Sequence, residues 1–508
     1  MFNLTRSLDR NADRHGDADA VVFQGRHYSH TRLLERVDAL SAAFLSIGIA
    51  RGDVVALLLG NSLQFLETTL AANRIGAIFL PLNTRLAAPE LDYILRHSGA
   101  STLVTEAVHT EKVAALASTR PNLRTIWVGE RGETHGLVYD DLIGLHAGER
   151  VVPADVRERD LHRLMYTSGT TSHPKGVPIT HGNFLWKTVA HIAEFGITEH
   201  DRTAMVGPMY HVGAFDLPGI GTWWVGGSLL ILPRFDPSEL LTAIEQDRPT
   251  NVWLAPSMVN ALLQSPELDS IDTSTIRFII GGGEKMPVPL IERLLGAFPN
   301  ARFADAYGLT ETVAGDTFLD AAHTISKIGS VGKPVLNVDL KITQEDGTEA
   351  PAGTLGEVLL RGPKVVSRYW NDPDATAAAF TDDGWFRTGD IGHLDEDGYL
   401  FIDDRKKDMI VSGGENIATS EVERAVYEHP AVLEAAVIGM PDERWGEVPC
   451  AYVVLKPGEV LTEVELIEHC RTRIARFKAP KAVRFIDALP RNPSGKVLKR
   501  QLRETQNA

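Results

Sequence analysis

The sequence predicts a mixed α/β protein with a large N-terminal domain and a small α+β C-terminal domain. Three observations predict it. Helical and strand patterns alternate over the first 150 residues and again after residue 200. Beyond about residue 335 the pattern becomes β-rich, and the last 100 or so residues return to a compact mixture of both. Alternation of this kind is typical of parallel sheets that carry helices on both faces.

The N-terminal elements come in helix–strand pairs. Apolar side chains at helical spacing predict helices over Thr31–Ile49 and Leu63–Ile75. Short apolar runs follow them at Val54–Leu59 and Ala77–Leu80, and their length favours buried strands over helices. Two parallel strands with crossover helices are therefore expected before residue 100.

The same pattern returns after residue 200. Asp236 can cap a helix whose first turn holds Pro237, because proline is tolerated where the backbone N–H has no intrahelical partner. Val252–Leu254 and Arg277–Ile280 are the strands expected to follow. This stretch therefore predicts a second parallel sheet.

A domain boundary is expected at the charged segment Asp403–Asp408, which separates two apolar stretches. We place the N-terminal domain at residues 1–404 and the C-terminal domain at residues 405–508. Within the latter, Ser420 and Glu423 match a capping box that opens a helix ending before Pro430. A second helix is expected around Glu463–Ala475, with strands on either side.

Composition excludes several classes of protein. The 508 residues include 67 acidic and 51 basic side chains, which gives a formal charge of −16. A nucleic-acid-binding protein is not expected, because such proteins need a basic surface. The only cysteines, Cys450 and Cys470, exclude a disulfide scaffold and fit a reducing compartment. No apolar run approaches the roughly 18 residues of a membrane span, and the N-terminus lacks a signal-peptide core. A cytoplasmic protein with no transmembrane segment and no nucleic-acid partner is expected.

The strongest local signal is the segment Met165–Gly176, which is rich in Ser, Thr and Gly after an apolar strand end. Such a loop can approach an anion closely with many N–H and O–H donors, and Lys175 adds a positive charge. A P-loop is excluded because Pro174 precedes Lys175 and Gly176 follows it. Ser172–Lys175 matches the SxxK pattern of penicillin-binding enzymes, but the chain has no KTG or SDN, so that hydrolase is a remote alternative.

Three further blocks carry polar residues suited to nucleotide chemistry. Asp305–Thr312 places an aromatic ring beside a glycine, which suits a purine, and a carboxylate beside a hydroxyl, which suits Mg²⁺ near phosphates. Gly384–Gly392 contains Asp390, which can accept both hydroxyls of a ribose, and Pro490–Lys496 ends in a lone lysine. Taken singly, the first could be an ordinary turn, the second a solvated turn and the third a solvated charge.

Together the four blocks resemble the adenylate-forming superfamily of acyl-CoA synthetases, firefly luciferases and peptide-synthetase adenylation domains. Their order and separation match from about residue 10 to 503, most closely those of bacterial fatty-acyl and aryl-carboxylate CoA ligases. The resemblance implies an adenylation domain, a small mobile C-terminal lid and two half-reactions. A carboxylate first attacks the α-phosphate of ATP, giving acyl-AMP and pyrophosphate, and coenzyme A then displaces AMP. ATP, Mg²⁺ and coenzyme A are the implied cofactors.

The resemblance assigns roles by motif position. Glu311 and Thr310 would act on the α-phosphate, with Glu311 and Thr167 as metal ligands. Lys496 would bridge the carboxylate and the α-phosphate, where its charge stabilises the transition state. His211 would gate the acyl pocket. The implied ATP site consists of Thr167, Ser168, Gly169, Thr170, Thr171, Lys175, Gly282, Gly283, Asp305, Tyr307, Gly308, Thr310, Asp390, Arg405 and Lys496.

The thioester half-reaction is implied to use another face of the lid. Lys407 occupies the family's hinge position, and rotation there would exchange Lys496 for that face. The implied coenzyme A contacts are Gly413, Gly414, Trp445, Phe477, Lys478 and Arg85. The resemblance also suggests a homodimer, although nothing in the residues requires one.

The acid is expected to be an apolar monocarboxylate, fatty or aromatic. The implied pocket stretches Val212–Phe215, Gly281–Gly283 and Val313–Gly315 are mostly small or apolar and hold no arginine for a second carboxylate. Asp216 is no secure match to the aspartate that binds the amino group in peptide-synthetase domains. An acyl-AMP ligase that loads a carrier protein and a luciferase-like oxygenase remain as alternatives. Ser172 stands where the family usually has glycine, at a cost on the order of 1 kcal/mol if that position needs a positive φ.

Overall fold

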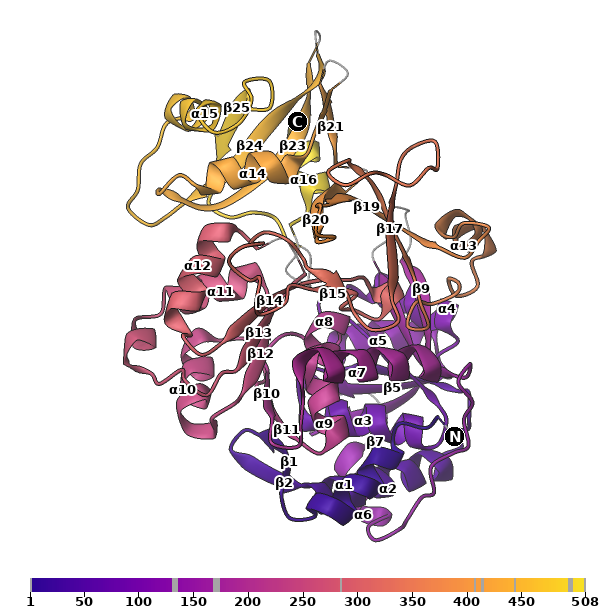
Figure 1. Cartoon of the computed structure of the whole chain (residues 1–508). Helices are drawn as coiled ribbons and strands as arrows, with labels where there is room; N and C mark the ends of the chain where they lie inside the picture. The colour runs from indigo at the N-terminus through magenta and orange to yellow at the C-terminus, as the bar shows by residue number, and fades with distance from the viewer. Residues whose placement is uncertain are drawn as a thin grey trace.

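Helices and strands alternate through most of the chain, as expected. The computed structural model describes residues 2–129, 136–167, 174–283, 286–405, 408–412, 415–442, 445–491 and 497–506. Its described strands form four sheets. Figure 1 shows the C-terminal segment, in yellow, above the rest of the chain.

The first sheet has the strand order β7-β6-β5-β3-β4-β8-β9 and is parallel except for β9. The strands are β3 (Val54–Leu58), β4 (Ile78–Pro81), β5 (Thr102–Glu106), β6 (Arg124–Val128), β7 (Leu137–Val138), β8 (Leu161–Thr167) and β9 (Lys175–Thr180). The two apolar runs expected before residue 100 are thus neighbours in a parallel sheet. The prediction is confirmed to within one residue at each end.

The second sheet has the order β16-β15-β14-β13-β12-β10-β11-β1-β2, with a parallel centre and antiparallel edges. The strands are β1 (Asp19–Phe23), β2 (Arg26–Ser29), β10 (Arg202–Met205), β11 (Ser228–Ile231), β12 (Asn251–Leu254), β13 (Phe278–Gly281), β14 (Arg302–Tyr307), β15 (Thr317–Phe318) and β16 (Lys333–Pro334). Strands β12 and β13 are those expected after the Asp236 helix.

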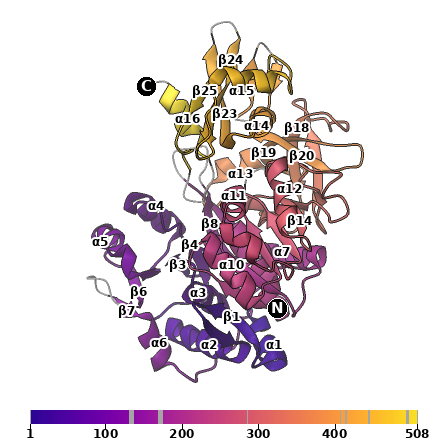
Figure 2. The ribbon, with the colours of Figure 1, turned by 90° about the vertical axis from the view of Figure 1, so that its left-hand side faces the viewer.

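Helices cover both faces of the two sheets, so the N-terminal part forms alternating layers (Figure 2). Helices α4 (Ala88–Ser98) and α5 (Thr110–Thr119) cover the outer face of the first sheet. Between the sheets lie α2 (His30–Ser46), α3 (Leu63–Arg74) and α7 (His181–Phe195), and α10 (Pro237–Asp247), α11 (Pro256–Leu263) and α12 (Val288–Ala297) cover the outer face of the second. The shorter elements are α1 (Arg6–His15), η1 (Ala107–His109), α6 (Tyr139–Leu145), α8 (Val212–Phe215), η2 (Asp216–Ile220), α9 (Gly221–Val225), η3 (Pro266–Ser270) and η4 (Thr310–Thr312).

Two further sheets complete the fold. The third is antiparallel, in the order β17 (Asp339–Thr343), β18 (Gly356–Arg361), β19 (Phe386–Leu394) and β20 (Leu400–Arg405), with α13 (Pro373–Ala379) beside it. The fourth combines β21 (Ile410–Ser412), β22 (Glu415–Ile417), β23 (Val432–Asp442), β24 (Gly446–Leu455) and β25 (Ala482–Phe485). Helices α14 (Thr419–Tyr427) and α15 (Glu463–Arg471) pack on one face of this sheet, and α16 (Lys499–Gln506) packs on the other.

The helix-capping predictions had different outcomes. Asp236 caps α10 through a hydrogen bond from the Glu239 N–H, as expected. The capping box at Ser420 is wrong, because Ser420 lies inside α14 and donates its hydroxyl to the Asp403 carbonyl. The first N–H of α14, that of Thr419, donates instead to the Asp404 carboxylate at 2.6 Å. A residue distant in sequence therefore takes the place of the local cap.

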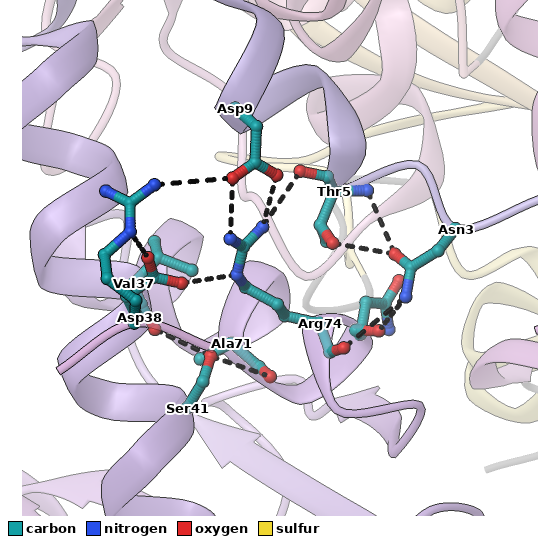
Figure 3. Close-up of polar contacts among 10 residues, drawn as sticks. Asn3, Thr5, Asp9, Val37, Asp38, Ser41, Ala71 and Arg74 are labelled. Carbon is teal, nitrogen blue, oxygen red and sulfur yellow. Dashed lines mark hydrogen bonds and ion pairs between the residues drawn. The ribbon is translucent and has the colours of Figure 1, made fainter. Parts of the chain in front are cut away.

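A buried guanidinium ties the first three helices together (Figure 3). Arg74, only 1% exposed, donates through Nε to Asp38 on α2 at 2.5 Å and through both terminal nitrogens to Asp9 on α1 at 2.9 Å. Arg150 also approaches Asp38, at 3.1 Å. Burial raises the pKa of Asp38, while Arg74 and Arg150 oppose that shift. Charges in such an interior persist because each has a partner.

The described helices include none that is both long and apolar enough to cross a bilayer.

Candidate active site

Three of the predicted site segments begin at the carboxyl ends of parallel strands. Thr167 ends β8, Gly281 ends β13 and Tyr307 ends β14. Ligands of open α/β sheets bind at this edge, because the loops that leave the strands are free to surround them. Strand β9 lies against η4, which brings the two parallel sheets together at this point.

The predicted phosphate loop closes a β-hairpin. Strands β8 and β9 are antiparallel, and Thr167 is paired with Lys175 at the mouth of the loop. The backbone N–H of Trp370 donates to the Gly176 carbonyl at 2.8 Å, which fixes a distant segment beside β9. Ser168, Gly169, Thr170, Thr171 and Ser172 lie outside the described residues.

Tyr369 connects the hairpin of β8 and β9, called the phosphate hairpin below, with the predicted nucleotide block Asp305–Thr312. Its hydroxyl donates to Oε1 of Glu311 at 2.9 Å, and the Lys175 ammonium lies 4.8 Å from the centre of its ring. Burial raises the pKa of Tyr369, and the negative charge of Glu311 raises it further. The phenol therefore stays protonated and serves as a donor to the carboxylate.

Sequence reasoning missed Tyr369. It lies 58 residues from Glu311 in sequence, and no spacing pattern connects the two positions. The only local signal is the pair Tyr369-Trp370, which is compatible with any partly buried strand end. Its role depends on the path that brings residues 366–370 across the end of β9, where the Val366 N–H also donates to the Glu311 carbonyl at 2.9 Å.

The segment after Glu311 has an unusual backbone. Val313, Ala314 and Gly315 have φ angles of 58°, 60° and 59°, so three consecutive residues are left-handed. This conformation costs roughly 1–2 kcal/mol for each non-glycine residue, and a β-branched side chain makes it rarer still. Strain of this size persists where the surrounding structure holds it, and such positions cluster at functional sites.

Lys364 is the residue that holds the strained segment. Its buried ammonium donates to the carbonyls of Ala314 and Gly315 at 2.7 and 2.9 Å and to the Asp316 carboxylate at 2.5 Å. From α7, His191 Nε2 lies 3.0 Å from the same Gly315 carbonyl. Because a carbonyl only accepts, we assign the His191 proton to Nε2. Burial holds the pKa of His191 well below its usual range, so the ring is neutral.

The predicted nucleoside residues also meet. The Tyr307 hydroxyl donates to Oδ2 of Asp390 at 2.6 Å, although the two residues lie 83 positions apart. Asp390 is paired with Arg405 between β19 and β20, and Asp305 is buried on the same strand as Tyr307. A Cβ on Gly308 would lie 2.4 Å from the Gly315 backbone nitrogen, so only glycine fits there.

The nearby glycine turn also needs its residue type. Gly283 has a φ of +92°, which disfavours any side chain, and it follows Gly282 directly after β13. Residues 284 and 285 lie outside the described residues.

The predicted acyl segment begins at His211. The Gly213 N–H donates to His211 Nδ1 at 3.2 Å, so this ring caps helix α8 and carries its proton on Nε2. Asp216 at the other end of α8 is buried, with Arg163 donating to it at 3.1 Å and the Lys187 ammonium 3.6 Å away. Asp216 is therefore committed to internal cations and cannot serve as a substrate-binding carboxylate. Burial lowers the pKa of Lys187 to about 8.

The predicted coenzyme A residues come from two parts of the chain. Arg85 is exposed in the loop after β4. Burial raises the pKa of the Tyr210 phenol, and the nearby charge of Arg85 offsets part of that shift. Trp445 and Phe477 are 44% and 43% exposed, large values for aromatic side chains. Lys478 is held by both oxygens of Glu421 at 2.9 and 2.8 Å. Gly413, Gly414, the predicted hinge residue Lys407, the predicted catalytic residue Lys496 and the side chain of Arg405 lie outside the described residues.

Comparison with known proteins identifies the family. The model of the AMP-binding enzyme family matches residues 8–370, and that of the AMP-binding enzyme C-terminal domain matches residues 421–496. A feruloyl-CoA synthase from an Amycolatopsis species is 40% identical over 97% of this chain and 97% of its own length. A long-chain-fatty-acid–CoA ligase from Mycobacterium tuberculosis is 39% identical over 91% of this chain and 90% of its own.

A solved structure shares the whole fold. The anthranilate CoA ligase AuaEII in complex with anthranoyl-AMP superimposes with a TM-score of 0.92 at 28% identity, covering 99% of this chain and 96% of its own. Family models that match well over half of the chain, together with these relatives, leave one assignment. The chain belongs to the AMP-binding enzyme family and, within it, is an acyl-CoA synthetase.

Proposed function

We propose that the chain is an ATP-dependent carboxylate–CoA ligase that activates an apolar monocarboxylic acid, aryl or fatty, in two half-reactions. The observation that carries the proposal is the convergence of Lys175, Tyr369 and Glu311 at the mouth of the phosphate hairpin. Tyr307 and Asp390, the residues suited to a nucleoside, are joined by a hydrogen bond beside the strained segment after Glu311. Cation, carboxylate and nucleoside-binding groups are the set that ATP activation requires.

In the first half-reaction, a carboxylate oxygen of the acid attacks the α-phosphorus, and the bond to the pyrophosphate oxygen breaks. We assign Lys175 and the loop that begins at Thr167 to the β- and γ-phosphates, and Thr310 with Glu311 to the α-phosphate. Asp390 receives the ribose hydroxyls, and Gly282, Gly283 and Tyr307 border adenine, with Asp305 on the same strand as Tyr307 and Gly308 directly after that strand. Lys496, on the lid, stabilises the charge that develops at the α-phosphate.

We assign a Mg²⁺ site to Glu311, with Thr167 as a second oxygen donor. One buried carboxylate with neighbouring hydroxyls fits this ion, which prefers oxygen ligands and usually takes few protein groups beside the substrate phosphates. Bound there, the ion would neutralise phosphate charge while Tyr369 orients the carboxylate.

In the second half-reaction, the thiolate of coenzyme A attacks the acyl carbonyl carbon, and AMP leaves with the bonding electrons. We assign this step to a second lid position, reached by rotation at Lys407. Gly413, Gly414, Trp445, Phe477, Lys478 and Arg85 are the proposed contacts of coenzyme A. His211 gates the acyl pocket between the two steps.

We place the boundary between the two domains at 404/405. The apolar cores of the first three sheets draw their residues from positions up to 402, and those of the fourth sheet begin at Ile410. The bonds from Thr419 and Ser420 to Asp404 and Asp403 cross this boundary, so they belong to one lid position. We also propose a cytoplasmic homodimer. Cys450 and Cys470 are buried thiols, which fit a reducing compartment. Light scattering tests the dimer.

The test is pyrophosphate release from ATP with a panel of aromatic and fatty monocarboxylic acids, with and without coenzyme A. We expect pyrophosphate with some acids, and thioester with AMP once coenzyme A is added. Pyrophosphate that appears without any response to coenzyme A would instead favour a carrier-protein acceptor. No pyrophosphate with any acid, from protein of normal thermal stability, would refute the proposal.

A further inference from the structure

Trp253 has an unusual environment. It lies on β12, is 6% exposed and belongs to the same apolar core as Val212, Ala214 and Tyr307. Glycines from different segments surround its indole. A Cβ on Gly207 would lie 2.8 Å from Cζ3 of the ring, and one on Gly213 would lie 3.4 Å from Cε2. Side chains at these positions would compete with the indole for space.

The same indole also lies against the glycines that follow strand β13. A Cβ on Gly282 would lie 3.4 Å from the indole Nε1, and one on Gly283 would lie 3.6 Å from Cζ2. Gly207 and Gly213 flank His211 before and within α8, whereas Gly282 and Gly283 follow β13. These are two of the stretches assigned to the acyl pocket. The ring therefore fills the space between them.

We propose that Trp253 is a specificity-determining residue whose indole closes the inner end of the acyl pocket and selects compact, ring-sized acyl groups over extended alkyl chains. A long chain bound between α8 and the end of β13 would have to pass through the volume of the indole. Protein interiors are close-packed, so the ring cannot be compressed, and the glycines around it offer no side chains that could move away.

An aromatic acid gains from the same arrangement. The edge and face of an indole favour a second ring in offset or edge-to-face contact, which adds to the gain from burying apolar area. The lining residues Val212 and Ala214 are apolar and add no hydrogen-bonding requirement. The inference rests on the proposed ligase function and narrows its substrate to aryl or similarly compact acids.

The test compares Trp253→Ala, Trp253→Phe and the matched control Trp223→Ala with the unaltered enzyme. Trp223 is a buried tryptophan on α9, outside the assigned acyl stretches. Pyrophosphate release is measured with benzoate, cinnamate, hexanoate and decanoate, and thermal unfolding of each protein is recorded. The readout is the ratio of kcat/KM for decanoate to that for cinnamate, because this ratio is insensitive to the fraction of folded protein.

In the unaltered enzyme we expect kcat/KM for decanoate to be at least about tenfold lower than kcat/KM for cinnamate. Trp253→Ala should raise the ratio by at least about tenfold, Trp253→Phe should raise it less, and Trp223→Ala should leave it unchanged. If Trp253→Ala does not fold, the shift in Trp253→Phe decides. A ratio unchanged within twofold, or an equal shift in Trp223→Ala, would overturn the inference while the ligase function stands. No pyrophosphate from the unaltered enzyme with any acid would refute the ligase function and this inference with it.

Discussion

Removing one phenolic oxygen tests the centre of the proposed site. In Tyr369→Phe the ring remains beside the Lys175 ammonium, 4.8 Å away in the unaltered protein, so the cation–π contact is preserved. The change removes only the hydroxyl that donates to Glu311 at 2.9 Å. Glu311 is buried, and the loss leaves its carboxylate with one donor fewer and with more freedom to rotate.

The expected loss follows from the strength of that bond. A hydrogen bond to a charged group contributes about 1.5–3 kcal/mol, and each 1.36 kcal/mol is tenfold in rate. If Glu311 acts on the α-phosphate, kcat for pyrophosphate release should fall by about 10- to 150-fold. The KM for ATP should change little, because the ring, Lys175 and the nucleoside residues are untouched.

The chain offers a matched control in Tyr399. This buried phenol donates to the Asp320 carboxylate at 2.8 Å, away from the proposed site. Tyr399→Phe should therefore cost similar stability and leave kcat unchanged. Stopped-flow measurement of pyrophosphate, with thermal unfolding of both variants, makes the comparison. A Tyr369→Phe enzyme with kcat within twofold of the unaltered one, or an equal loss in Tyr399→Phe, would refute the reasoning.

Three further changes test other parts of the argument. Lys496→Ala should abolish adenylation but spare thioester formation from preformed acyl-adenylate, and separate assays of the two half-reactions measure this. Loss of both activities together would contradict the assignment of Lys496 to the first half-reaction alone. The pKa of Lys187 is about 8 in the folded protein, below the ordinary value of 10.5. Between pH 8 and 10.5 the unfolded chain therefore binds a proton that the folded protein lacks. The free energy of unfolding should rise by about 3 kcal/mol over this pH range. Lys187→Met should remove that rise in urea unfolding from pH 7.5 to 10.5, while Asp216 keeps its bond from Arg163; parallel curves for the two proteins argue against it. Arg74→Met should lower the free energy of unfolding by about 3–5 kcal/mol, because Asp38 stays buried without its main partner; a urea midpoint close to that of the unaltered protein is the contrary result.

The fold was largely predictable because its signals are local. Helix α2 and strands β3 and β4 follow from apolar periodicity, and the start of α10 follows from Asp236 and Pro237. These preferences act over a few residues, where spacing decides which face of an element is apolar. The capping box at Ser420 failed for the same reason, because a tertiary contact from Asp404 replaced the local cap.

In the candidate site, too, the residues within local motifs were predictable and the contacts between distant positions were not. Motif spacing pointed to Lys175, Glu311, Tyr307 and Asp390, since each stands in a block whose residue types suit one part of ATP. Spacing gave no indication that Tyr369 binds Glu311. It also gave no indication that Lys364 binds the strained segment after Glu311, which lies 48 to 50 positions away in the sequence.

By itself the sequence determined the family, the order of elements and the chemistry available in each motif, because all three are written in residue types at short spacing. Only the tertiary structure decided which side chains meet: Tyr369 with Glu311, Lys364 with the carbonyls of Ala314 and Gly315, and Trp253 with its glycines. Such contacts depend on the path of the chain between distant positions. That path follows from how whole sheets and helices pack, which no short stretch of sequence specifies.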